Sequence, residues 1–118
     1  MARINGGIAL AKTLRALGVR EVFTLHGGHL DSFLVACADE QIRLTDTRHE
    51  ASAGHAAEAY ARATGEIGVC VITAGPGFSN ALTAPSWSMV PLRPETNFSA
   101  VISETSSLQV SAICSRCR

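Results

Sequence analysis

Apolar positions follow two different spacings along the first two thirds of the chain, one typical of amphipathic helices and one typical of buried strands. Leu10, Leu14 and Leu17 recur at helical spacing before Gly18, a usual helix stop. The run 68–73 is apolar and β-branched, as expected of a buried strand. The pattern predicts helix and strand in alternation: helix 7–17, strand 19–25, helix 30–39, strand 42–45, helix 48–65, strand 68–73 and a helix from Phe78.

This alternation predicts the α/β class with an open parallel sheet. Parallel neighbours need crossover connections, and right-handed crossovers place helices on both faces of the sheet. Ligands of such sheets bind outside the carboxyl ends of the strands. The sequence places three short segments at those ends: Gly27-Gly28, His49-Glu50 and Gly75-Pro76-Gly77.

The pattern changes after Ala84. Residues 85–118 hold three of the four prolines, many serines and only short apolar stretches, so we assign no element there. We therefore predict a partial domain over residues 1–84 and a divergent, poorly ordered tail over residues 85–118. The sheet is expected to be incomplete at its C-terminal side, as in a truncated domain.

Composition narrows the class of protein. Of the 118 residues, 47% are hydrophobic and 17% are charged, which favours a globular domain with one core. The formal net charge of zero gives no electrostatic basis for binding nucleic acid or an anionic membrane. The first residues lack the apolar core of a signal peptide, so we expect a cytoplasmic protein.

Glu50 has two interpretations from spacing alone. Thr47 and Glu50 fit a capping box, in which both side chains satisfy backbone N–H groups at a helix start. Glu50 could instead be a catalytic carboxyl group beside the carboxyl ends of the strands. On spacing alone, capping is the favoured interpretation.

The Gly75-Pro76-Gly77 segment also has two interpretations. It closes a strand and opens a helix, where backbone N–H groups could meet an anion. However, it lacks the second half of G-x-G-x-x-G and the lysine of a P-loop. By itself the segment is better read as a plain turn.

Taken together, the run from Thr47 to Gly65 and the segment from Gly75 to Asn80 resemble the pyrimidine-binding domain of thiamine diphosphate enzymes. The branch concerned contains acetolactate synthases, 2-keto-acid decarboxylases and 2-hydroxyacyl-CoA lyases. The resemblance covers residues 4–84. It departs from the family pattern at Thr24 and His26, where glycine and proline are usual, and at 78–79, where alanine and threonine are commoner.

The resemblance implies that Glu50 hydrogen-bonds the aminopyrimidine ring of thiamine diphosphate and thereby activates the cofactor. It implies the following cofactor-binding residues: Gly27, Gly28, Glu50, Gly75, Pro76, Gly77 and Asn80. Family members bind Mg²⁺ and the diphosphate through a separate domain with a Gly-Asp-Gly element, which does not occur in these 118 residues. We therefore expect no metal ligand in this chain.

The resemblance also implies partners. Family members pair through the helix that matches Ala51–Ala63, so we expect a dimer with a diphosphate-binding domain or a full-length homologue, acting on a 2-keto acid. The chain would then be part of an enzyme and inactive alone. Two other functions stay open: a non-catalytic interaction module, and a nucleotide-binding domain that uses Gly75–Gly77.

Overall fold

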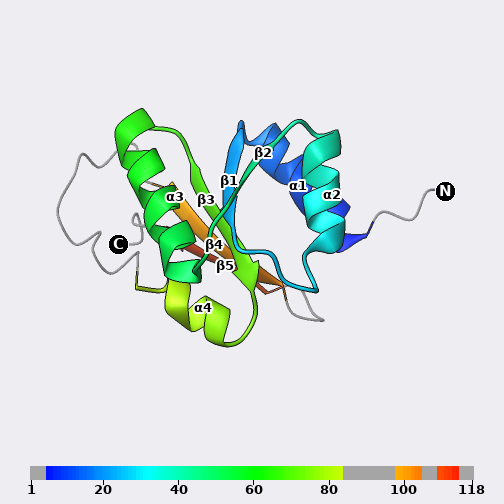
Figure 1. Ribbon diagram of the computed structural model, residues 1–118. Coiled ribbons are helices and arrows are strands. Elements are labelled where there is room, and N and C mark those ends of the chain that lie inside the picture. Colours follow the sequence, from blue (N-terminus) through cyan, green and yellow to red (C-terminus); the bar gives the residue numbers. More distant parts are fainter. Residues whose placement is uncertain (1–4, 84–97, 105–108, 115–118) are drawn as a thin grey trace.

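The computed structural model describes residues 5–83, 98–104 and 109–114, with side chains described over 5–83 (Figure 1). Its strands form one sheet in the order β2-β1-β3-β4-β5, in which β1 to β4 are parallel and β5 runs antiparallel to β4. The elements, in chain order, are α1 (Gly6–Ala16), β1 (Glu21–Thr24), α2 (Asp31–Asp39), β2 (Arg43–Asp46), α3 (Glu50–Thr64), β3 (Gly68–Thr73), α4 (Pro76–Ala81), β4 (Phe98–Glu104) and β5 (Gln109–Cys114).

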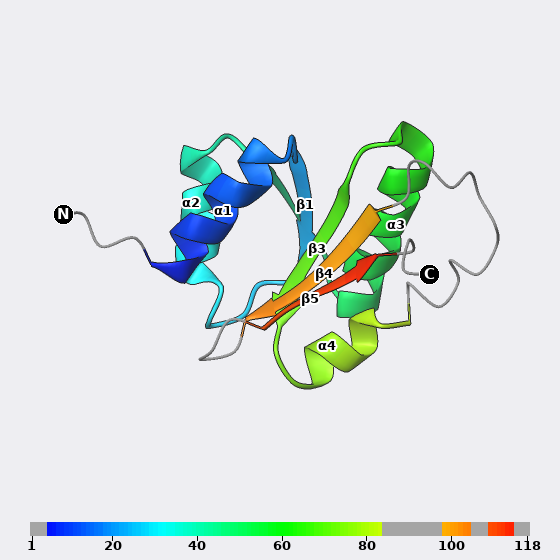
Figure 2. The ribbon, with the colours of Figure 1, turned by 180° about the vertical axis from the view of Figure 1, so that it is seen from behind.

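Helices cover both faces of the sheet. In Figures 1 and 2, α1 and α2 lie on one side of β1 and β3, and α3 and α4 lie on the other. The side chains of β3 divide accordingly: Val69 and Val71 join the cluster under α1 and α2, whereas Cys70 and Ile72 join the cluster under α3. This arrangement confirms the predicted α/β class with helices on both faces.

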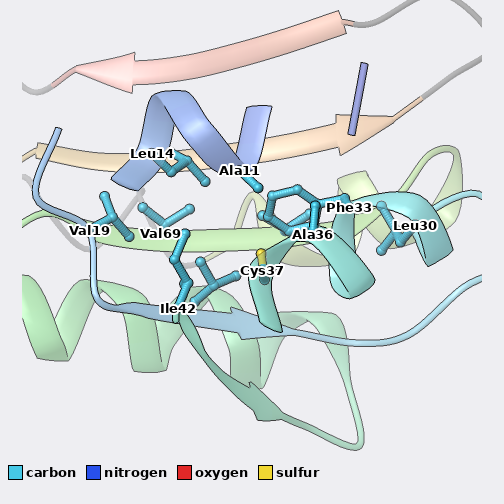
Figure 3. Close-up of a cluster of buried hydrophobic side chains, with 11 residues drawn as sticks. Ala11, Leu14, Val19, Leu30, Phe33, Ala36, Cys37, Ile42 and Val69 are labelled. Carbon is cyan, nitrogen blue, oxygen red and sulfur yellow. The ribbon is translucent and has the colours of Figure 1, made fainter. Parts of the chain in front are cut away.

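The larger cluster forms the core between α1, α2 and the sheet (Figure 3). Phe33 of α2 and Leu30, the N-cap of that helix, are fully buried in it together with valines of β1 and β3. The smaller cluster is built largely from alanines, including Ala53 and Ala57, so α3 can approach the sheet closely.

The structure corrects two details of the sequence analysis. Helix α4 begins at Pro76 rather than Phe78, because proline suits the first helical position, where no N–H is needed. We assigned no element after Ala84, yet β4 and β5 lie there and extend the sheet. Their short apolar stretches become strands because β4 pairs with β3 and β5 pairs with β4, a context that local pattern does not reveal. The division at residues 84 and 85 stays a prediction.

Candidate functional site

The start of α3 determines where Glu50 can act. Glu50 is the first residue of the helix, and His49 is the N-cap: its Nδ1 accepts a hydrogen bond from the Ala51 N–H at 3.1 Å. The Thr47 hydroxyl instead lies 3.1 Å from the Thr24 carbonyl oxygen and 3.0 Å from that of His49. The capping-box interpretation is therefore wrong, because a histidine takes the role that the box gives to threonine and Glu50 lies two positions too early.

The Glu50 carboxylate lies between α3 and α4, which are neighbours in both views (Figures 1 and 2). Its Oε2 accepts a hydrogen bond from Asn80 Nδ2 at 3.1 Å. A Cβ atom added to Gly77 would lie 3.1 Å from Glu50 Oε1 and 3.4 Å from its Cγ. Because Gly77 has no side chain, the partly buried Glu50 carboxylate can lie directly against it.

The electrostatics of the site favour an ionised glutamate. The N–H group of Glu50 itself, the Asn80 amide and, more weakly, His49 lower the pKa of the Glu50 carboxyl group. Beneath it, burial and the negative charge of Glu50 raise the pKa of Cys70 to about 12, so this thiol stays protonated. Glu50 is therefore the one of these two groups that carries charge at neutral pH.

Thr73, the last residue of β3, joins two of the predicted glycine segments. A Cβ atom added to Gly27 would lie 1.7 Å from Thr73 Cγ2, and one added to Gly77 would lie 3.1 Å from Thr73 Oγ1. The sequence analysis did not single out Thr73. Its position at the end of the strand, two residues before Gly75, was the available signal, because the final residue of a strand borders the ligand side of a parallel sheet.

The structure brings some predicted site residues together and leaves others apart. Gly27, Glu50, Gly77 and Asn80 form a contiguous set around Thr73. We call this set, with Thr73, the carboxylate site. The remaining predicted residues are exposed and lie outside these contacts: Gly28, Gly75 and Pro76. Gly75 has a φ of 79°, a backbone conformation that favours glycine, so this residue allows the chain to turn between β3 and α4.

We expect Gly27→Ala to destabilise the protein, because the new methyl group would overlap the Thr73 methyl group. The expected loss in the free energy of unfolding is about 1–3 kcal/mol, measured by urea denaturation. Thr73→Ser removes that methyl group, so the double variant should recover part of the loss. Additive losses in the double variant would contradict the contact.

We expect the stability contributed by the Glu50 charge to depend on pH. The pKa of Glu50 is lower in the folded chain than in the unfolded chain. The ionised carboxylate therefore stabilises the fold above the unfolded pKa, about 4.3, and this contribution disappears as the pH falls through the folded pKa. In urea denaturation, wild type should be more stable than Glu50→Gln at neutral pH and lose that advantage in acid. A difference that is constant with pH would contradict the assignment.

Other polar clusters in the described residues serve the fold. Glu21, 6% exposed, lies at the opposite end of β1 from the carboxylate site. Its carboxylate accepts hydrogen bonds from Thr45 and from Arg43 Nε, the latter at 2.6 Å, which ties β1 to β2. Over the same residues, no three histidine, cysteine or acidic side chains are grouped to hold a metal ion.

Comparison with known proteins identifies the class that this fold and site define. The family described as "Thiamine pyrophosphate enzyme, N-terminal TPP binding domain" matches residues 4–85. The chain belongs to this family, as the resemblance predicted. No helix in the described part of the chain is long and apolar enough to cross a membrane.

Particular relatives share about half of the aligned residues. 2-Hydroxyacyl-CoA lyase 2 of Mus musculus is 52% identical over 76% of this chain and 14% of its own length. The Homo sapiens protein of the same name is 54% identical over 68% of this chain and 13% of its own length. A probable acetolactate synthase of Mycobacterium bovis is 47% identical over 69% of this chain and 15% of its own length. The chain thus matches only a small part of these relatives.

Proposed function

We propose that this chain binds the aminopyrimidine half of thiamine diphosphate and supplies Glu50 to activate it, in a carboligase or decarboxylase that acts on 2-keto acids. The observation that carries the proposal is the Glu50 carboxylate held between Asn80 and the Cβ-free Gly77. Membership of the thiamine pyrophosphate enzyme family supplies the cofactor class.

The residues present fit one half of the cofactor. A carboxylate at the start of a helix can hydrogen-bond a ring nitrogen. Because Gly27 and Gly77 have no side chains, the surface beside this carboxylate consists of backbone atoms and Thr73. The negative charge of Glu50 disfavours a diphosphate directly beside it, so we assign the pyrimidine ring to this half-site.

When bound, thiamine diphosphate supplies the nucleophilic carbon for attack on a keto group. The contribution of this chain is to hold and move a proton at the Glu50 carboxylate, facing the ring. The lowered pKa of Glu50 keeps the carboxylate ionised and able to accept a hydrogen bond, and desolvation by a bound ring would raise this pKa and favour proton uptake. Its partial exposure in this chain means that water must be excluded by the ligand or by a partner surface.

We propose that a diphosphate-binding domain, on a partner or on a full-length homologue, provides Mg²⁺ and that surface. Helix α3 supports a dimer contact over Ala51–Ala63. Ala53, Ala57 and Ala61 pack on the sheet, whereas other small residues of the helix, Ser52, Ala59 and Ala63, are exposed. An exposed face of small side chains allows a second backbone to approach closely.

A chimera tests the proposed function. The segment of human 2-hydroxyacyl-CoA lyase 2 that aligns with this chain is replaced by the corresponding residues of this chain, and the lyase activity is measured with thiamine diphosphate and Mg²⁺. We expect activity and cofactor binding by calorimetry, while the 118-residue chain alone has no activity. A folded chimera that binds no cofactor would refute the proposal.

That last outcome would favour the alternative, a non-catalytic interaction module that uses the exposed face of α3. The two proposals differ in one further measurement. An interaction module should co-purify with a full-length homologue without changing its activity, whatever residue stands at position 50. A cytoplasmic location stays a prediction.

A further inference from the structure

Asn80 contacts the Glu50 carboxylate from a different element. It lies on α4, whereas Glu50 begins α3, and the two side chains meet at 3.1 Å. Over residues 5–83, Asn80 is the one side chain that donates a hydrogen bond to this carboxylate. Because an ionised carboxylate only accepts hydrogen bonds, the amide NH₂ of Asn80, and not its oxygen, must face Glu50.

Besides the N–H of Glu50 itself, the surroundings leave Asn80 as the group that orients the carboxylate. The Glu50 side chain rests against Gly77, which has no Cβ to block its rotation on that side. The adjacent residue, His49, directs its Nδ1 to the Ala51 N–H rather than to Glu50. Cys70 lies beneath as a neutral thiol. The Glu50 N–H and the Asn80 amide therefore supply the directional contacts to this carboxylate, and of the two only Asn80 reaches it from another helix.

We propose that Asn80 is a positioning residue that holds the Glu50 carboxylate between α3 and α4, instead of binding the cofactor directly. The significance of this role for the reaction rests on the proposed function. Oε2 is engaged by Asn80, and Oε1 lies at the start of α4 against Gly77. Asn80 thereby fixes which carboxylate oxygen lies at the Gly75–Gly77 turn.

Nuclear magnetic resonance on the full 118-residue chain, without cofactor, tests this role. Carbon-13 shifts of the Glu50 carboxyl group follow its titration, and side-chain coupling constants report its rotamers. In Asn80→Ala we expect the pKa of Glu50 to rise toward the ordinary range of glutamate and its couplings to become averaged. In Ser79→Ala, an exposed neighbour on the same helix, both readouts should match wild type.

Asn80→Asp keeps the experiment decisive if Asn80→Ala does not fold. Aspartate has nearly the shape of asparagine but places a second carboxylate beside the first, so the pKa of Glu50 should rise further than in Asn80→Ala. An unchanged pKa and unchanged couplings in a folded Asn80 variant would overturn the proposal. These readouts need no cofactor. A folded chimera that binds no cofactor would therefore refute the proposed function, while the titration and couplings of Glu50 would still decide the role of Asn80.

Discussion

Replacing Gly68 with alanine is expected to cost about 3 kcal/mol of the free energy of unfolding. The added Cβ atom would lie 2.0 Å from the Ala57 carbonyl oxygen and 2.8 Å from its carbonyl carbon. Both atoms belong to the backbone of α3, so the helix itself would have to move away from β3. A domain of this size has a total stability of about 5–15 kcal/mol, so urea denaturation should show a large drop in the midpoint.

Gly28→Ala is the matched control for this experiment. Within the described part of the chain, no heavy atom beyond its two chain neighbours lies within 4 Å of the Cβ that it would add, so its midpoint should stay close to that of wild type. The comparison with Gly27→Ala is also informative, since the obstacle there is the Thr73 side chain, which a second substitution can remove. No side-chain substitution relieves a clash with backbone, so Gly68→Ala has no such rescue. Equal midpoints for Gly68→Ala and Gly28→Ala would contradict the close approach of α3 and β3.

The elements up to α4 were predictable because each carries its own periodicity. The strand 68–73 was predicted with the bounds that it has, since a continuous apolar run between Gly65 and Gly75 leaves little choice. Strands β4 and β5 were not predictable, because serines interrupt their apolar residues. Pairing of β4 with β3 and of β5 with β4 supplies what local preference lacks.

The site was predictable as a set of segments but not as a set of contacts. Topology alone places Gly27, Glu50 and Gly77 at the carboxyl ends of neighbouring strands. It does not tell whether Thr47 or His49 caps α3, since the two candidates lie two residues apart and both side chains can accept from an N–H. The Asn80 contact to Glu50 depends on the direction that α4 takes after the turn at Gly75, and local sequence does not define that direction.

Glu50→Gln in the chimera is expected to lower kcat about 10²- to 10⁴-fold, the range for loss of a proton-transferring group. Glutamine keeps the length of the side chain, its packing on Gly77 and an oxygen that can accept from Asn80. What it loses is the negative charge and the ability to take up a proton. The expected result is therefore a loss in kcat with the fold retained, measured by steady-state kinetics alongside urea denaturation.

The size of this loss separates the catalytic role of Glu50 from a structural one. Glu40→Gln, at the end of α2 on the opposite face of the sheet, serves as the control and should leave kcat unchanged. Cofactor affinity should fall much less than kcat, because we propose that another domain holds the diphosphate and because glutamine can still hydrogen-bond a ring. If Glu50→Gln and Glu40→Gln have the same kcat in an active chimera, then the carboxylate at the start of α3 is not the activating group.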